Sequence, residues 1–487
     1  MLRRMLLLLA VFAAQCGAAE HMLLNATPAW DGLIRAGASS EIGLHLLAGY
    51  GGELTVTLTT PASRVDYSAT LEPNVPLLLA LPVPPARADL VHIEARLNGL
   101  SSAQQDIHLK SLPADQQVAA VIGEISGAWH TSRPLSIIHP GAAALPRHGW
   151  SYAVIDLLVM DTTSLRQLSA PQAEALQEYL ATCGRFIGYR MPQSVIEVLR
   201  SNAGCNSRLV KTADSLQQLA ASADALLKDT RPALPAVSEL RSLLPDEDRQ
   251  QWIMPLVILF TGYFLVLLTA AHSRSGGTWL PAIPILASLL GLFAWSGGEV
   301  ETRLINWAAM ESGSRTARYS ALLETRARGQ GEAVVMLPAR LGPPDPAQAH
   351  VFMRVRQLPG TAGLQLGFPT RLFSRHEFVL QGNINPHIQL VLGVAAAGPV
   401  IDNHGQVQSP PALLAWHGNK YSVPPLSPGE RWVAPEKPET WGNDGAERIL
   451  REQALREIAA LLIPYSLADA GIIATDTDTH GYLMVYL

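Results

Sequence analysis

Two uncharged apolar runs in the middle of the chain constrain its fold more than any other feature. The first covers residues 252–271 (WIMPLVILFTGYFLVLLTAA) and the second covers residues 279–295 (WLPAIPILASLLGLFAW). A helix needs about 20 apolar residues to cross a hydrocarbon core of about 30 Å. The segment between the runs, HSRSGGT, is too short for a domain. The pattern therefore predicts a transmembrane hairpin, with one helix at 252–271 and a second at 278–298.

The first 19 residues are typical of a secretory signal peptide. Arg3 and Arg4 precede an apolar stretch over residues 5–14, and residues 17–19 (GAA) are small enough for a cleavage site. An uncleaved anchor is the alternative. Export would place the segments on both sides of the hairpin in the periplasm of a bacterium. We therefore expect a two-pass bacterial inner-membrane protein with its N- and C-terminal domains in the periplasm.

Composition narrows the range of partners. The chain has 487 residues, of which 48% are apolar and 16% are charged, and its net charge is −5. A chain of this length holds about two to four domains, and its negative charge does not indicate nucleic acid binding. Neither apolar run contains an ionisable residue, which argues against an ion pathway. We expect envelope or inner-membrane proteins and the lipid bilayer as partners, while the sequence does not identify a small-molecule ligand.

Residues 20–112 contain short runs typical of an all-β module. The clearest is ELTVTLTT at residues 53–60, which alternates apolar and polar residues with the period of a half-buried strand. Gly, Pro and Asn separate such runs at intervals that favour a β-sandwich. The other candidate strands lie at 42–47, 75–81, 90–97 and 105–109.

The pattern then changes to alternating strands and helices. Residues 118–122 (VAAVI) and 152–160 (YAVIDLLVM) are continuous apolar runs, as in strands buried on both faces of a parallel sheet. Ser169 and Gln172 have the spacing of a capping box at the start of a helix. This succession predicts an α/β domain over residues 115–245. Its further elements are predicted at 185–189 (a strand) and 212–228 (a helix).

This segment resembles a degenerate class I glutamine amidotransferase-like domain found in uncharacterised bacterial membrane proteins. Such copies typically read Y-x-x-x-D, then Leu, then Q-x-x-A-L-x-x-[WY]-[VL]-x-x-G-G. The likeness covers roughly residues 115–230 and implies a flavodoxin/amidotransferase-like fold with a docking or scaffolding role. The matching positions are Tyr152, Asp156, Leu165, Gln172, Ala175, Leu176, Tyr179, Leu180 and Gly184, with Cys183 in place of the first Gly.

The cysteines argue against extending this resemblance to catalysis. An active amidotransferase carries a nucleophilic Cys on a tight strand-to-helix turn, with a downstream His and Glu. Cys183 instead follows a predicted helix, Cys205 has no strand before it, and no His lies between His148 and the first apolar run. A thiolate without a neighbouring base or cation is a poor nucleophile. We therefore predict no glutaminase activity.

Cys183 and Cys205 are instead candidates for a disulfide. Cys16, the third cysteine, would leave with the signal peptide, and an oxidising compartment lets the remaining two cysteines bond. Two unrelated buried thiols are the alternative.

The last part of the chain, residues 325–487, is predicted to form a β-rich domain with a terminal helix. An amphipathic helix is expected just before it, at 299–325, and a second β-sandwich at about 330–435. The terminal helix is placed at 445–462. Candidate strands lie at 333–337, 351–358, 377–381, 388–394, 413–416, 472–474 and 482–486.

Three sets of polar residues are candidates for chemistry. Asp476, Asp478 and His480 alternate along the chain and could begin a metal site, or they form a polar turn. Asp156 lies where an open α/β fold can bind a ligand, or it is a hydrogen-bonded structural carboxylate. The third set, for which chance polarity is the alternative, is Asn383, Asn385, His387 and His376.

These patterns predict a multidomain protein of α/β and all-β parts: a β-sandwich, a flavodoxin/amidotransferase-like domain, a two-helix transmembrane hairpin and a second β-sandwich. We identify no catalytic, cofactor-binding or metal-binding residue and expect no cofactor. The expected function is that of a membrane-anchored periplasmic binding or scaffolding protein, a non-catalytic component of a cell-envelope assembly. The alternative is an envelope hydrolase with a site between modules, which would need a nucleophile, a base and an orienting group in one cleft.

Overall fold

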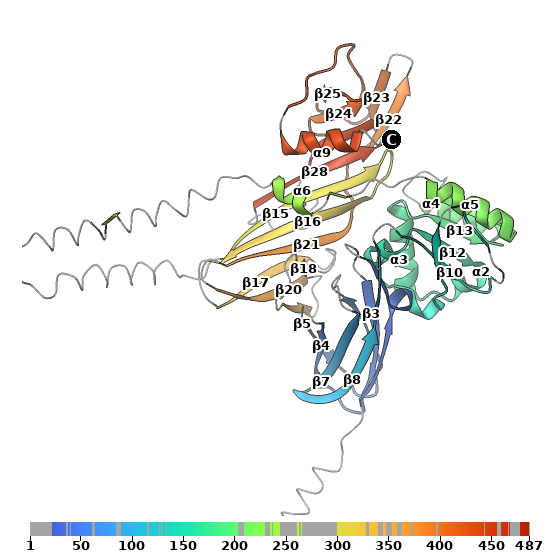
Figure 1. The fold of residues 1–487 in the computed structure, drawn as a ribbon, viewed down its shortest axis with the longest axis vertical. Coiled ribbons are helices and arrows are strands. Elements are labelled where there is room, and N and C mark those ends of the chain that lie inside the picture. The colour runs from blue at the N-terminus through green and yellow to red at the C-terminus, as the bar shows by residue number, and fades with distance from the viewer. Residues whose placement is uncertain are drawn as a thin grey trace, which may run out of the picture.

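A computed structural model shows that β-strands form most of the described chain and that most of the described helices gather in one unit, drawn in green in Figure 1. In this view the sandwich formed by the first strands lies below that unit, and the long strands of the C-terminal half lie to its left. The residues described are 22–243, 261, 262, 264 and 300–486, except 36–37, 39, 61–63, 84–88, 114–115, 126, 128, 133, 203–208, 229–233, 236, 328–330, 339–343, 347–352, 358–362, 372–373, 396–397, 443, 455–458, 466 and 468–477.

The N-terminal unit is a β-sandwich of two antiparallel sheets. Its strands are β1 (Leu23–Pro28), β3 (Ser40–Leu47), β4 (Gly52–Thr59), β5 (Arg64–Leu71), β6 (Leu77–Val83), β7 (Leu90–Leu97) and β8 (Leu100–His108). The sheet orders are β1-β3-β6 and β5-β4-β7-β8. The predicted alternation is present in β4, where Leu54, Val56 and Leu58 are buried in one core with Ile42 and Leu44 of β3. Burial of each such side chain contributes about 1.5–3 kcal/mol, so this alternation holds the two sheets together.

The helical unit is a five-stranded parallel sheet with the spatial order β11-β10-β12-β13-β14. Its strands are β10 (Gln117–Ile122), β11 (Leu135–Ile138), β12 (Leu157–Asp161), β13 (Phe186–Tyr189) and β14 (Val210–Ala213). Its helices are α2 (Thr162–Arg166), α3 (Ala170–Ala181), α4 (Gln193–Asn202) and α5 (Leu216–Lys228), with the 3-10 turns η2 (Ala142–Ala144) and η3 (Gly149–Val154). In chain order the sheet reads 2-1-3-4-5, the flavodoxin-like arrangement.

Both faces of this parallel sheet are covered, which explains the continuous apolar runs. In β10, Val118, Ala120 and Ile122 join a core with α3 and α4, while Ala119 and Val121 join a separate core with α5. The capping box of Ser169 and Gln172 at the start of α3 is confirmed. The strand expected at 152–160 begins later, because residues 149–154 form η3.

An eight-stranded sheet dominates the C-terminal half, with the order β18-β21-β16-β15-β28-β27-β24-β25. Two three-stranded sheets, β17-β20-β19 and β22-β23-β26, flank it. Helices α6 (Val237–Ser242) and α9 (Gly445–Ala454) pack on one face, where Leu240 and Ile449 contact the core around Trp307. The strands are β15 (Val300–Glu311), β16 (Ala317–Ala327), β17 (Gly331–Pro338), β18 (Asp345–Pro346), β19 (Arg354–Gln357), β20 (Gly363–Thr370), β21 (Arg375–Ile384), β22 (Leu390–Ala395), β23 (Gly398–Asn403), β24 (Ala412–Trp416), β25 (Asn419–Val423), β26 (Arg431–Val433), β27 (Ala459–Pro464) and β28 (Asp478–Tyr486).

The amphipathic helix expected at 299–325 is wrong, since this segment forms β15 and most of β16. Both faces of β15 are buried: Leu304 and Ala308 lie in one core, and Trp307 lies in the other. In a strand with two buried faces, apolar and polar residues no longer alternate. Some of its apolar residues then fall three or four positions apart, as they do in an amphipathic helix. The second sandwich expected at 330–435 is not a separate unit, because the strands of this segment are divided between the eight-stranded sheet and the two three-stranded sheets. The terminal helix ends at Ala454 before β27.

Within the described ranges, no helix is long and apolar enough to cross a membrane. This finding contradicts the two-helix transmembrane hairpin, and with it the membrane anchoring and the two-pass inner-membrane localisation. The physical reason is length: a span needs about 20 consecutive apolar residues in a helix, whereas α5, the longest of the described helices, has 13 residues. Apart from Thr261, Gly262 and Phe264, the two apolar runs lie outside the described residues, as does the expected signal at 1–19.

Buried contacts join the sandwich to the α/β unit. The linking segments are η1 (Ala29–Gly32) and β2 (Leu33–Arg35), and β2 pairs in parallel with β9 (Lys110–Leu112). Trp30 is fully buried, and its Nε1 donates to the carbonyl of Ser151 at 2.9 Å. Glu41, also buried, accepts hydrogen bonds from the backbone N–H of Arg147 and from Nδ1 of His148. These contacts hold η3 against the sandwich.

Candidate functional site

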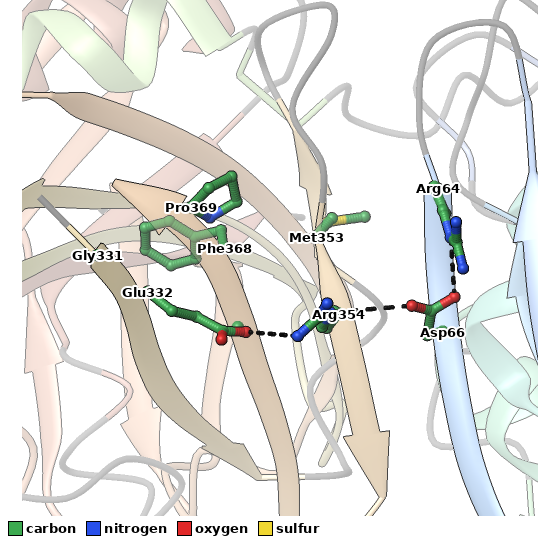
Figure 2. A pocket seen from close by; sticks show the side chains of 9 residues that line it. Arg64, Asp66, Gly331, Glu332, Met353, Arg354, Phe368 and Pro369 are labelled. Carbon is green, nitrogen blue, oxygen red and sulfur yellow. Dashed lines mark hydrogen bonds and ion pairs between the residues drawn. The ribbon is translucent and has the colours of Figure 1, made fainter. Parts of the chain in front are cut away.

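A cavity of about 320 Å³ lies where the sandwich meets the small sheet β17-β20-β19 (Figure 2). Its wall on the sandwich side comes from β5, and its other walls come from the three strands of the small sheet. The lining residues are Arg64, Asp66, Gly331, Glu332, Met353, Arg354, Gly367, Phe368 and Pro369. We call this the junction cavity. Its volume is at the lower end of the range usual for ligand sites, about 300–1,000 Å³.

Strand alternation places the charged side chains of the junction cavity on one surface. The backbone N–H of Met353 donates to the carbonyl of Arg64 at 3.4 Å, which holds β19 beside β5. Val65 and Val355 point into a shared apolar core. Because successive side chains of a strand point to opposite faces, Arg64 and Arg354 point outward. The outer faces of two separate units thus form one polar surface.

A glycine opens the floor of the cavity. Gly367 lies opposite Val334 on one side and Arg354 on the other. A Cβ at position 367 would lie 2.9 Å from Oε1 of Glu332, so a larger residue would displace that carboxylate. Gly367 therefore leaves open the space beside the side chains of Glu332 and Arg354, which both line the cavity.

The charges of the junction cavity are paired loosely with one another. Nε of Arg64 lies 3.2 Å from Oδ1 of Asp66, and Nε of Arg354 lies 3.9 Å from Oδ2 of the same carboxylate. Nη1 of Arg354 lies 3.5 Å from Oε1 of Glu332. Arg354 is 70% exposed, and ion pairs of this kind contribute about 0–1 kcal/mol. An incoming ligand therefore displaces these contacts at little cost.

The polar surface continues from the cavity across the sandwich sheet. Oγ1 of Thr57 on β4 donates to Asp66 at 2.8 Å. On β7, the guanidinium of Arg96 donates to Glu94 at 2.8 Å, and Gln104 of β8 donates to the same carboxylate. The hydrogen bond that Arg96 donates to Glu94 is the main cause that raises the pKa of Arg96 above its usual value. The outer face is thus an ordered row of polar groups that leads into the junction cavity.

The lining of the junction cavity provides charged groups that can bind a polar ligand. The described lining residues include no Ser, Thr, Cys or His. Two guanidinium and two carboxylate groups give the lining no net charge. Throughout the described part of the chain, no group of three or more His, Cys, Asp or Glu side chains could hold a metal ion. The arrangement can bind a polar ligand through charge-assisted hydrogen bonds.

The carboxylate of Asp156 is hydrogen-bonded to other groups of the protein. Its carboxylate lies 2.7 Å from Nη2 and 3.2 Å from Nη1 of Arg35, and it accepts the backbone N–H of Val118 at 2.8 Å. Nη2 of Arg35 also donates to the carbonyl of Gln116. Of the two roles considered for Asp156, the structure shows the hydrogen-bonded structural one, which ties the sandwich to the parallel sheet.

A carboxylate of the protein also fills the crevice where open α/β folds bind ligands. In the order 2-1-3-4-5 that crevice lies at the carboxyl ends of β10 and β12. Asp161, at the end of β12, accepts the backbone N–H of Ser164 at 2.7 Å and of Glu124 at 3.1 Å. A Cβ at Gly123 would lie 2.3 Å from the Asp161 carboxylate, so the loop and the side chain are in close contact. Asp161 therefore caps α2 and holds the loop after β10 in place.

Cys183 is disulfide-bonded, so it offers no thiolate. It follows α3 in the left-handed region, with φ of 63°. Cys205 lies outside the described residues, and its pairing with Cys183 stays a prediction.

The other polar sets from the sequence are not assembled into a site. Asp478 and His480 lie in β28, and Asp476 lies outside the described residues. His376 and Asn383 lie seven positions apart on β21, which separates them by roughly 23 Å along the strand. Sequence reasoning missed Arg64, Asp66, Glu332 and Arg354, whose one signal was a charged residue on the polar face of a strand.

In a second charged cluster, on the eight-stranded sheet, the carboxylates are paired with arginines of the protein itself. Glu324 and Glu377 are buried directly opposite each other on β16 and β21. Arg375 lies 2.9 Å from both carboxylates, and Arg326 approaches Glu324 at 2.6 Å. Arg241 of α6 binds Glu377, and this hydrogen bond is the main cause that raises the pKa of Arg241. The cluster locks α6 onto the sheet and leaves no open carboxylate for a ligand.

Comparison with known proteins adds little. No protein-family model and no curated protein matches the chain. One solved structure is similar in part, a cycloisomaltooligosaccharide glucanotransferase of Paenibacillus sp. in complex with cycloisomaltoheptaose. The match has 11% sequence identity and a TM-score of 0.18, and it covers 34% of this chain and 27% of that protein. At this level it carries no argument about fold or function.

Proposed function

We propose that this chain is a binding or scaffolding protein without catalytic activity, which holds an extended segment of a partner protein in the junction cavity. The observation that supports it best is the loosely held guanidinium of Arg354 beside a cavity of about 320 Å³ at the meeting point of two units. Ligand sites occur preferentially at such boundaries between units. The sheets on both sides supply a rigid frame for the charged groups.

The shape and chemistry of the surface favour an extended polypeptide. β17 is the last strand of its sheet, and Glu332, Val334 and Met336 are all exposed on its outer face. An extended segment can lie across this exposed face toward β19 and present alternate side chains to it. Val334 and Met336 would contact apolar side chains of the segment. A carboxylate of the segment would replace Glu332 or Asp66 beside Arg354.

The experiment uses fluorescent eight-residue peptides that carry Glu at position 3 and Val at positions 5 and 7. A matched peptide has Lys at position 3. We expect the Glu peptide to bind the full chain, as measured by fluorescence anisotropy, and the Lys peptide to bind much more weakly. Arg354→Ala should weaken the Glu peptide about 10- to 100-fold, the equivalent of one charged hydrogen bond.

Arg431→Ala is the matched control. Arg431 is 66% exposed and pairs with Asp402 on the sheet β22-β23-β26, so its loss removes an exposed arginine away from the junction cavity. Equal affinity of the Arg354→Ala and Arg431→Ala variants would refute the proposal, as would equal affinity for the two peptides.

The alternative of a hydrolase with a site between units gains no support from Asp156. A hydrolase needs a nucleophile, a base and an orienting group in one cleft. The described hydrogen bonds of the Asp156 carboxylate go to Arg35 and to the backbone of Val118. Substitution of Asp156 should therefore affect folding rather than a reaction.

A further inference from the structure

A second, smaller cavity lies between the sheet β1-β3-β6 of the sandwich and η2 of the α/β unit. Its volume is about 80 Å³, and its lining residues come from β1, β3, β6 and the segment around η2. One water occupies about 10–15 Å³ by this measure, so the space corresponds to roughly five to eight waters or to a ligand of about eight non-hydrogen atoms. Ligand sites are common at such boundaries between units.

Gly43 forms the floor of this second cavity. Ile42 and Leu44 of β3 are buried in the sandwich core, so Gly43 between them lies on the opposite, outer face of the sheet. Its cross-strand neighbours on that face are Thr27 of β1 and Ala80 of β6. Because all three side chains in this row are small or absent, they leave a strip of main chain open on the floor of the cavity.

Neither the backbone nor the packing of the described residues requires a glycine at position 43. Its φ lies outside the left-handed region, and β3 pairs with both neighbouring strands without a bulge. Within the described residues, a Cβ at this position would meet the carbonyl oxygen of Thr27 at an ordinary distance of 3.6 Å and nothing nearer. Glycine weakens the interior of a strand, and there it often marks the close approach of a ligand or of another chain.

The surroundings of Gly43 fit a neutral aromatic ring with a polar tip. A flat ring can cover the main chain at a glycine, as aromatic side chains do within sheets. Asn25 and Thr27 are exposed on β1 opposite His45 and Gly43, so they supply an amide and a hydroxyl on the same face. Glu41 and Arg147 both line the cavity, so a ligand of either charge would meet a residue of like charge. A phenol ring, which is neutral at pH 7, avoids both.

The outer face beside the cavity favours a protein as the source of that ring. Leu78 of β6 lines the cavity and is 53% exposed, and it lies opposite His45. Leu23 of β1 is 63% exposed and lies opposite the half-buried Leu47. Apolar side chains that are exposed together beside an open cavity are typical of protein contact surfaces, where Tyr is among the residues that contribute most.

We propose that this cavity binds the side chain of a tyrosine of a partner protein. The ring lies on the open main chain at Gly43, and the phenol hydroxyl is hydrogen-bonded by the polar side chains of Asn25 and Thr27. A tyrosine side chain has about eight non-hydrogen atoms, which matches the volume of the cavity. This site is independent of the junction cavity and of the function proposed for it.

The experiment titrates the full chain with N-acetyl-L-tyrosinamide and follows binding by saturation-transfer NMR. N-acetyl-L-phenylalaninamide and N-acetyl-L-leucinamide are the matched probes. We expect the tyrosine probe to bind saturably and the phenylalanine probe to bind about 3- to 10-fold more weakly, since it lacks one hydrogen bond. The leucine probe, which has no ring, should bind more weakly still.

Gly43→Val tests the floor of the cavity directly. The added side chain occupies the place of the ring, so the tyrosine probe should bind about 10- to 100-fold more weakly, which corresponds to the loss of one buried apolar group. Because valine favours strands and a Cβ has room at this position, the Tm of the variant should not fall.

Gly393→Val is the matched control, because Gly393 is also a strand glycine outside the left-handed region but lies on β22, in a different sheet. It should leave binding of the tyrosine probe unchanged. The double variant Asn25→Leu with Thr27→Val keeps the floor open and should abolish the preference for tyrosine over phenylalanine. The proposal fails if the tyrosine and leucine probes bind equally, if Gly43→Val binds like the parent chain, or if both glycine variants lose the same affinity. A lower Tm of Gly43→Val would also overturn it, since the glycine would then serve the fold.

Discussion

The sandwich joins its two neighbours through junctions of opposite character. Toward the α/β unit, Arg35 and Asp156 are 12% and 24% exposed and form a two-pronged ion pair, reinforced by backbone contacts. Toward the small sheet β17-β20-β19, Arg354 is 70% exposed and lies 3.9 Å from Asp66. The first junction uses its charged groups to hold the units together. The second leaves its charged groups free to exchange partners.

Apolar packing explains how the second junction can leave its charges loose. Val65 and Tyr67 of the sandwich share one continuous core with Met353, Val355 and Phe368 of the C-terminal half. This core joins the two units without help from the surface ion pairs. A junction that is stable for apolar reasons can therefore carry a polar surface that serves binding.

The largest expected effect is that of Trp30→Ala at the first junction. Trp30 is fully buried, contacts Tyr152 and donates to Ser151. Removal of a buried Trp side chain costs about 3–5 kcal/mol through lost burial and the cavity left behind. The free energy of unfolding, measured with urea, should fall by that amount. Trp432→Ala, at a half-buried position on β26, should cost much less, and equal losses would contradict the central role of Trp30.

A direct test of the comparison replaces one arginine at each junction with methionine, which keeps most of the side-chain volume. Arg35→Met leaves the half-buried Asp156 without its cationic partner and should cost about 2–3 kcal/mol. Arg354→Met should cost less than about 1 kcal/mol. Urea unfolding of both variants measures the difference. Similar losses would mean that the second junction also depends on its ion pairs.

The sequence predicted local elements better than it predicted how they combine. The alternation at 53–60 and the capping box at Ser169 are local signals, and both are present. The prediction of a helix at 299–325 was wrong because both faces of β15 are buried, so its apolar residues do not alternate with polar ones. Pairing of β15 with β28, some 170 residues later, leaves no mark in a short window of sequence. The extent of the eight-stranded sheet was therefore beyond local pattern analysis.

The junction cavity was hidden for a related reason. Arg64 and Asp66 lie two positions apart on β5, as expected for the outer face of a strand. Glu332 on β17 and Arg354 on β19 are likewise charged residues next to an apolar one. A charged residue on a strand most often faces solvent without further consequence. Only the approach of β19 to β5, which are separated by almost 290 residues, turns two ordinary polar faces into one cavity.

The smallest expected effect is a pH dependence of the free energy of unfolding, caused by a histidine at the second junction. His376 packs against Phe368, a lining residue of the junction cavity, with ring centroids 5.1 Å apart. Within the described residues, neither ring nitrogen of His376 has a hydrogen-bond partner. Burial lowers the pKa of His376 below its usual value of 6.5. The folded chain thus holds this ring neutral at a pH where the unfolded chain protonates it.

The sign of the effect follows from proton linkage. Between the lowered pKa and about 6.5 the unfolded state binds more protons, so the free energy of unfolding rises with pH through this window and falls as the solution is acidified. His376→Phe should remove that part of the acid sensitivity, as measured by urea unfolding between pH 7.5 and pH 5. His92→Gln, which changes an exposed histidine paired with Asp106, is the control. Equal pH slopes of the free energy of unfolding for the parent chain and the His376→Phe variant would mean that the His376 ring is hydrated. The apolar packing at the second junction would then be looser than proposed here.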